Sequence, residues 1–419
     1  MRRVLKTKEN RIQIIDKIIA FLIKSFILVS LVFPMITVIK SRSDSSRAYP
    51  EFILSNLIVC FILAFVIIKV VFYKQWVSDY KYLLIALIIL ILLYDFFYLK
   101  QFDYIRWIWN AVNVTISFMF LGSLVVSIKK KFFNECRIIE FLIKAILITN
   151  FVGIIIYSLG YMSVGFADWK ISFIPFNFQL FYEYRFNWIY FHKSQYSLML
   201  LLYLGVFIVY KQKFINKGTY IASVIFLFIC LFLAHTNTSI IGAVIILLCD
   251  FIDYVLKNTK KNKRILYLGG ISFSAVIGLF LLRMSRERDL FSLGSRTVIW
   301  KASIKRIIQL PHGVGLKFRA VFIPLSDYMK TDNCHNVFLN EAFRFSIPVG
   351  ISYTALFVLL VFYSLKQKFS FLRLGIWLAV LIQLNMDYSL IATDLSIFLF
   401  LIYCIFFLPV SKNKETCTQ

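Results

Sequence analysis

The sequence predicts an all-α, polytopic membrane protein with about twelve transmembrane helices and one large external loop. Hydrophobic residues make up 60% of the 419 residues and charged residues only 16%. An ordinary soluble chain would have about a quarter of its residues charged. The apolar residues also gather in long runs that short basic connectors separate. We therefore expect a single polytopic membrane domain over residues 1–419.

Twelve apolar runs come close to the roughly 20 residues that a helix needs to cross the hydrocarbon core. We expect helices near residues 18–39, 52–73, 82–99, 107–128, 138–160, 194–210, 219–234, 239–256, 265–283, 347–365, 371–386 and 395–410. The first run is longer than a signal-peptide core, contains Pro34 and lacks a small-residue cleavage site, so we expect it to be retained. Only residues 235–238 separate the seventh and eighth runs, which suits a tight helical hairpin.

The distribution of Lys and Arg predicts the orientation in the membrane. Connectors on the side of the two termini hold 25 of these residues, and the short connectors on the other side hold 8. The segment 283–346 holds 11 more, but long loops cross the membrane largely regardless of charge. Both termini are therefore expected in the cytoplasm, and residues 161–193 and 284–346 are expected to form external loops.

The net charge of +26 first suggests nucleic acid as a partner. Most of the surplus lies in connectors such as 129–131, where orientation and anionic lipid headgroups account for it, so we predict no nucleic-acid partner. The basic residues of the large external loop have no such explanation, and they suggest an anionic ligand on the outer face. No C-x-x-C, H-E-x-x-H, Walker loop or G-x-G-x-x-G after a strand occurs, so we predict no metal and no cofactor.

The long polar segment from about 284 to 346 is where we expect the chemistry. Its candidate site residues are Arg296, Gly313, Gly315, His335, Asn336 and Glu341. The two glycines follow Pro311 in a spacing that suits positive φ and close backbone approach. The other external loop supplies two further candidates, Arg185 and His192, just before the sixth apolar run.

Five short motifs follow one another along the chain from Arg185 onward. They are Arg185 with His192-Lys193-Ser194, Thr236-Asn237-Thr238-Ser239, Arg296 with Trp300, Pro311-His312-Gly313-Val314-Gly315, and His335-Asn336 with Leu339 and Glu341. In this order, from Arg185 to the region of Gly350, they resemble the O-antigen ligase and Wzy-type polysaccharide polymerase superfamily. The chain departs from that pattern at Ile240, where many members have Arg, and at Ser346, where Gly is common.

The resemblance implies a GT-C-like glycosyltransferase architecture and a metal-independent glycosyl transfer on the outer face, with an undecaprenyl-diphosphate-linked donor. We expect Arg185 and Arg296 to bind the donor diphosphate, because the planar guanidinium fork can hold two phosphate oxygens at once. We expect His335 to act as the base, because imidazole accepts a proton near neutral pH. The supporting residues are Asn336, Glu341, His192, Gly313 and Gly315, of which Asn336 and Glu341 are close enough in sequence to orient the imidazole.

Simpler roles stay open for three of these residues. Arg185 could anchor its loop to headgroups, and His335 could brace its loop by hydrogen bonding. Arg296 could belong to an amphipathic helix that lies on the headgroups together with Lys301, Lys305 and Arg306.

The leading hypothesis is a polymerase of lipid-linked repeat units in capsule, exopolysaccharide or O-antigen synthesis, located in the bacterial cytoplasmic (inner) membrane. The alternative is a ligase of the same superfamily, which moves finished glycan onto another acceptor. A transporter or flippase of lipid-linked sugars is disfavoured, because alternating access does not need a long Arg-rich external loop. The expected partners are the lipid-linked donor, a glycan acceptor, membrane lipids, a flippase and a chain-length regulator.

Overall fold

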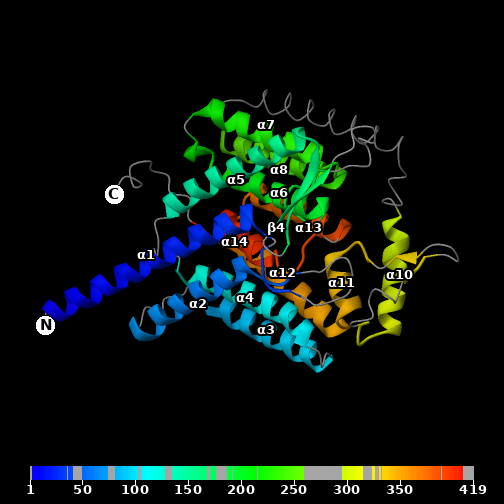
Figure 1. Cartoon of the computed structure of the whole chain (residues 1–419), viewed down its shortest axis with the longest axis horizontal. Helices are drawn as coiled ribbons and strands as arrows, with labels where there is room; N and C mark the ends of the chain where they lie inside the picture. The colour runs from blue at the N-terminus through cyan, green and yellow to red at the C-terminus, as the bar shows by residue number, and fades with distance from the viewer. Residues whose placement is uncertain are drawn as a thin grey trace. The chain divides into compact units, whose positions relative to one another are not determined.

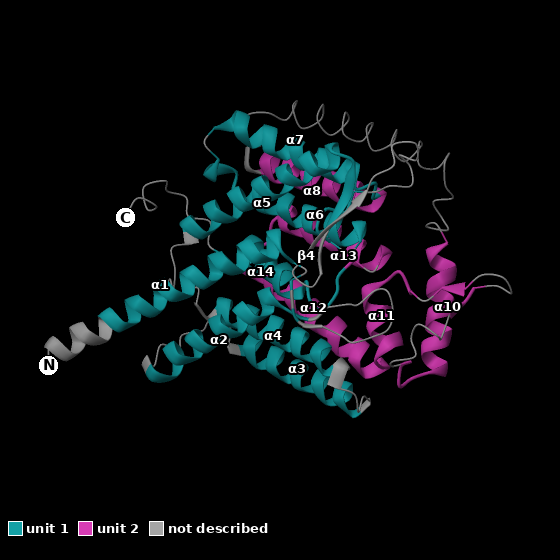
Figure 2. Cartoon of the chain, in the orientation of Figure 1, with its two compact units in different colours: residues 1–236, 390–419 teal, residues 237–389 magenta. Residues whose placement is uncertain are grey.

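The computed structural model of the protein is mostly helical (Figure 1). It describes residues 2–34, 36–40, 50–73, 81–101, 105–127, 135–167, 170–175, 186–190, 192–214, 216–258, 295–314, 323–325, 330–331, 333–387 and 389–408. The chain divides into two compact units (Figure 2). Unit 1 comprises residues 1–236 and 390–419, and unit 2 comprises residues 237–389.

Unit 1 contains eight α-helices in the residues that the structure describes. They are α1 (Arg2–Val32), α2 (Leu54–Tyr73), α3 (Lys81–Gln101), α4 (Ile105–Ser127), α5 (Glu135–Ser158), α6 (Lys193–Val209), α7 (Lys217–Leu233) and α14 (Leu395–Phe406). Unit 2 contains α8 (Asn237–Asn258), α10 (Arg296–Gln309), α11 (Val337–Arg344), α12 (Ile347–Gln367) and α13 (Phe371–Met386). Eleven of the twelve predicted runs overlap with helices, although residues 37–39 of the first run lie in a short strand, and the run at 265–283 lies outside the described residues.

Six helices of the described part are long and apolar enough to cross a membrane, namely α2, α3, α4, α5, α8 and α12. The helices α6, α7, α13 and α14 are apolar but have at most 17 residues. These helices agree with the predicted polytopic membrane protein. The count of twelve spans and the extent of the external loop stay predictions.

Three short antiparallel hairpins interrupt the helical pattern, and the sequence did not predict them. They are β1 (Thr37–Lys40) with β2 (Pro50–Ile53), β3 (Tyr161–Ala167) with β4 (Lys170–Pro175), and β5 (Ile323–Pro324) with β6 (Lys330–Thr331). The last two lie in the segments predicted as external loops. Their strands contain β-branched and aromatic residues that suit pairing, but they are too short to produce a long periodic pattern.

The buried helix α14 lies at the centre of unit 1, packed against α4 and α6. All twelve of its residues are buried, as expected of a helix that is apolar on every side. A polar contact network of α14 is also interior: the Ser396 hydroxyl donates to Asn56 Oδ1 at 2.8 Å, and Asn56 Nδ2 donates to Asn113 Oδ1 at 2.6 Å. Such amide and hydroxyl bonds hold apolar helices in register, because an unpaired polar group would be costly there.

In unit 2, α8 holds α13 at both of its ends. The Asp253 carboxylate accepts hydrogen bonds from the backbone N–H groups of Phe371 and Leu372, at 3.0 and 3.1 Å. At the opposite end, the Ser239 hydroxyl donates to Gln383 Oε1 at 2.9 Å. The two helices are therefore antiparallel, and the serine of the Thr-x-Ser motif reaches the last turn of α13.

The described part of the large predicted loop has a small core of its own. Ile307 of α10, Ile323 of β5, Cys334 and Phe343 of α11 are buried together, with further apolar side chains around them. This core fixes α10 relative to α11. The segment is thus a folded layer, which can hold side chains in a defined geometry.

Candidate active site

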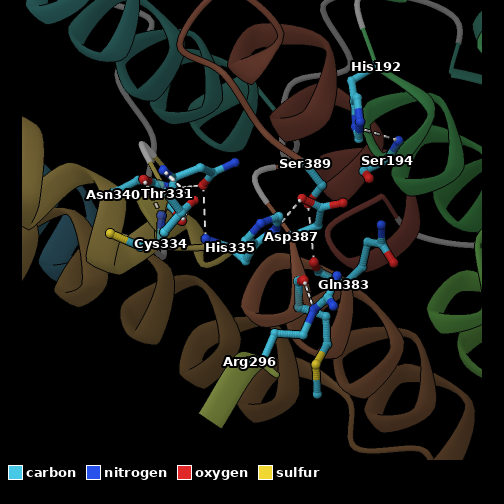
Figure 3. A network of polar contacts seen from close by, with 12 residues as sticks. His192, Ser194, Arg296, Thr331, Cys334, His335, Asn340, Gln383, Asp387 and Ser389 are labelled. Atoms are coloured by element: carbon cyan, nitrogen blue, oxygen red, sulfur yellow. Dashed lines mark hydrogen bonds and ion pairs between the residues drawn. The ribbon is translucent and has the colours of Figure 1, made fainter. Parts of the chain in front are cut away.

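Three predicted site residues contact three consecutive residues at the C-terminal end of α13, and Figure 3 shows two of them, Arg296 and His335. Asn336 Nδ2 donates to Asn385 Oδ1 at 2.7 Å, and Arg296 Nε donates to the backbone oxygen of Met386 at 2.9 Å. His335 Nδ1 lies 3.3 Å from Asp387 Oδ1. Residues 295–345 and the end of α13 are far apart in the sequence, so this convergence is a property of the fold.

His335 is held by its neighbours at the start of α11. Its backbone has a φ of 47°, in the left-handed region, and its N–H donates to Asn333 Oδ1 at 2.9 Å. The same oxygen accepts a hydrogen bond from Asn340 Nδ2 at 2.8 Å. Asn336 caps α11 by accepting from the Leu339 N–H at 3.0 Å, which is the usual role of an Asn at that position. The backbone is thus fixed while the imidazole stays 31% exposed, within reach of a substrate.

Arg296 is the first residue of α10, and its guanidinium turns toward the last carbonyls of α13. Those carbonyls lack partners within their own helix and carry its partial negative charge, so a cation is stabilised there. Trp300 follows one turn later on the same side of α10, which accounts for the spacing of the Arg-x-x-x-Trp motif. Lys301 and Lys305 are exposed, so Arg296 does not share their face of the helix.

The Thr-x-Ser motif, the Arg of α10 and the His-Asn pair therefore all contact the last turn or the end of α13. They are three of the five motifs that carry the resemblance to the superfamily. Residues 222–354 match the model of the O-antigen ligase family. The match confirms the predicted relation to the O-antigen ligase and Wzy polymerase superfamily, whose members are glycosyltransferase-like enzymes. No curated protein matches the chain.

The Pro311 turn lies inside the O-antigen ligase match and packs against the junction of α11 and α12. Gly313 has a φ of +75°, and a Cβ at this position would lie 2.6 Å from the backbone carbon of Phe345. The Ile347 N–H donates to the backbone oxygen of Pro311 at 3.1 Å. Gly313 therefore has both the positive φ and the close approach expected of this turn, whereas Gly315 lies outside the described residues.

The carboxylate that contacts the imidazole is Asp387, 52 residues further along the chain and beyond the O-antigen ligase match. Sequence reasoning pointed to Glu341, which is buried in α11, and it missed Asp387. The sequence did contain a signal for Asp387, because it is an acidic residue directly after an apolar run, in a connector without Lys or Arg. Only the fold shows that this connector lies beside His335.

The Cys334 thiol is another polar group near the site. It is fully buried beside His335, and burial raises its pKa to about 11. The thiol therefore stays protonated near neutral pH and is unsuited to act as a nucleophile.

The structure accounts for one of the two departures from the family pattern, at Ser346, and not for the other, at Ile240. Ser346 lies directly before α12, and its hydroxyl accepts from the Val349 N–H at 3.4 Å as a helix cap. Its backbone is extended, so this position does not need glycine. Ile240 follows Ser239 on α8 and is partly exposed. Nothing in the structure explains the hydrophobic residue there.

The other two candidates precede the O-antigen ligase match and belong to unit 1. Arg185 lies outside the described residues. The next residues are anchored: Trp188 is 5% exposed, and its indole N–H donates to Thr149 Oγ1 at 3.2 Å. His192 is exposed and caps α6, with Nδ1 accepting from the Ser194 N–H at 3.3 Å.

Proposed function

We propose that the protein is a polymerase that joins undecaprenyl-diphosphate-linked oligosaccharide repeat units in capsule, exopolysaccharide or O-antigen synthesis. The observation that carries the proposal is the meeting of His335 and Arg296 at the end of α13. A transfer from a diphosphate-linked sugar needs a base for the acceptor hydroxyl and positive charge for the leaving group. At the end of α13, His335 provides the base and Arg296 provides the positive charge.

His335 acts as the base in this mechanism. With the Nδ1 proton directed at the Asp387 carboxylate, the lone pair of the ring lies on Nε2, which takes the proton of the acceptor hydroxyl. The acceptor oxygen bonds to the anomeric carbon as the bond from that carbon to the diphosphate oxygen breaks. Asp387 then stabilises the imidazolium until its proton passes to solvent or to the departing phosphate.

Arg296 and Arg185 bind the donor diphosphate and neutralise the charge that grows on it as it leaves. Charge-assisted hydrogen bonds of this kind contribute most when charge develops in the transition state. The mechanism assigns no step to a metal ion. Asn336 fixes the start of α11 and Gly313 shapes the adjoining turn, while Gly315, Glu341 and His192 are the further supporting residues of the proposal.

This chemistry requires that residues 284–346 face the outside of the bacterial cytoplasmic membrane and that both termini face the cytoplasm. A tag after Asp327 should react with an impermeant reagent in intact cells, and tags after Lys260 and Gln419 should not. A protected tag at 327 would rule out transfer on the outer face.

Replacement of His335 tests the base. His335→Gln keeps hydrogen-bonding capacity but cannot accept the proton, so it should produce no detectable polymer, as should His335→Ala. Donor binding should persist in both variants, because the arginines provide it. Normal-length polymer from His335→Gln would show that His335 is only a brace, and His192 would then be the next base to test.

A ligase is the second candidate, and the description of the matching family as O-antigen ligase supports it. The same residues would serve both reactions, since only the acceptor differs. A deletion strain separates the two. Loss of long chains with single repeats still attached indicates a polymerase, and accumulation of full-length polymer on its lipid carrier indicates a ligase.

A further inference from the structure

Helix α10 has two different faces. Its inner face contributes Ile299, Ser303 and Ile307, which are buried. Its outer face is a stripe in which Val298, Ile304 and Ile308 are 48%, 47% and 67% exposed, and Lys301 and Lys305 are also exposed. These five residues, the outer stripe, occupy about a third of the helix circumference at 3.6 residues per turn. The helix contains no acidic residue.

Both ends of α10 are tied to the same side of a pair of apolar helices. At its start, Arg296 donates to the last residue of α13, and just after its end Pro311 accepts from the first residue of α12. Residues 368–370 alone join α12 to α13, so the chain reverses direction between these two apolar helices. The beginning of α12 and the end of α13 therefore lie on one face of the membrane.

A helix of 14 residues is about 21 Å long at 1.5 Å per residue. With both ends held at the level where α12 enters and α13 leaves the membrane, α10 must run roughly parallel to the membrane plane. Its position is then that of the headgroup layer, where apolar side chains can enter the acyl boundary and lysines can reach phosphates.

We propose that α10 is an interfacial helix whose outer stripe docks on anionic phospholipid headgroups of the leaflet around α12 and α13. Charge complementarity selects this occupant, because the stripe combines two lysines with three large apolar side chains and no acid. Docking would fix the height of Arg296, on the inner side of the same helix, at the level of a lipid-linked diphosphate. The proposal holds for a polymerase and for a ligase alike.

Photo-crosslinking of the full-length protein in nanodiscs tests this. We would place p-benzoylphenylalanine at Ile304 or at Ile308 and use discs of phosphatidylcholine mixed with phosphatidylglycerol. Ile351, which is 65% exposed on α12, provides the positive control for lipid capture. We expect lipid adducts at both test positions, with phosphatidylglycerol enriched over its share in the disc. A lysine near an anionic surface contributes about 1 kcal/mol, so the enrichment should be at least about fivefold.

The lysines are tested in the same assay. Lys301→Gln with Lys305→Gln should return the adducts to the bulk lipid ratio. The matched pair Lys211→Gln and Lys213→Gln removes the same charge from another element and should leave the enrichment unchanged. Crosslinks to a second copy of the chain in place of lipid would overturn the proposal, as would an enrichment that survives loss of Lys301 and Lys305.

Discussion

Replacing Asp387 by Asn is the sharpest test of the site, because the change is nearly isosteric and removes only the negative charge beside His335. In the proposed mechanism the imidazole becomes positively charged when it takes the acceptor proton. The carboxylate 3.3 Å away stabilises that charge and holds the ring with Nε2 toward the substrate. An amide carries no negative charge and holds the ring less firmly. Asp387→Asn should therefore destabilise the transition state, in which the imidazole is charged, more than the bound ground state, in which it is neutral.

The geometry sets the size of the effect. Two unit charges 3.3 Å apart attract by about 1.3 kcal/mol in water and by about 5 kcal/mol at an effective dielectric constant of 20. Asp387 is 15% exposed and His335 is 31% exposed, so the pair lies between these limits. A loss of about 2 to 3.5 kcal/mol corresponds to a fall in kcat of roughly 30- to 400-fold. KM for the donor should change by less than about threefold, because the arginines bind it.

The assay is the initial rate of polymer formation from a lipid-linked repeat unit by purified protein. Asp253→Asn provides the matched control, since it makes the same change at the other end of α13, where the carboxylate caps Phe371 and Leu372. It should lower thermal stability and leave kcat near wild type. Full kcat in Asp387→Asn would refute the role of the carboxylate. An equal fall in both variants would show that α13 is displaced in each.

Three further changes have expected outcomes. Arg296→Lys keeps the charge but loses the guanidinium fork, so polymer synthesis should fall more than about tenfold with normal membrane insertion; near-wild-type chains would leave Arg296 only as an anchor of α10 to the end of α13. Gly313→Ala should cost about 2 kcal/mol or more, seen as a lower Tm, because φ is +75° and the new Cβ would meet backbone at 2.6 Å; an unchanged Tm would contradict the close approach. Burial raises the pKa of Asp394 from 3.8 to about 7. The unfolded chain ionises first, so stability should fall as pH rises from about 4 to 7, by roughly 4 kcal/mol, and Asp394→Asn should raise Tm more at pH 8 than at pH 4.5. An equal gain at both pH values would contradict the raised pKa.

The helices could be predicted because they depend on local composition. A run of about 20 apolar residues has few alternatives to a membrane helix, and eleven of the predicted runs overlap with helices. The turn at Gly313 could be predicted for the same reason, because a Pro followed by spaced glycines restricts the backbone locally. The β3–β4 hairpin was missed because strands of six or seven residues within a loop leave no comparable pattern.

The partner of His335 could not be predicted, for the opposite reason. Glu341 follows His335 within two helical turns, so sequence proximity favoured it, yet α11 buries that side chain in its own packing. Asp387 reaches the imidazole because α13 packs along α8, where the Ser239 hydroxyl donates to Gln383 in the last turn before Asp387. A contact that depends on three separate helices has no signature in one segment.

The choice of Arg at position 296 follows from where α10 begins. The last carbonyls of α13 attract any cation, and a lysine there could satisfy Met386 equally well as a point charge. The single ammonium group of a lysine would then have to contact both the carbonyl and the substrate. The guanidinium carries five N–H donors in one plane. Its Nε can therefore donate to the carbonyl at the end of α13, and this hydrogen bond orients the two terminal NH2 groups. An Arg at the start of α10 can therefore serve as an anchor and as a phosphate ligand at once, and this is why the substitution by Lys separates the two roles.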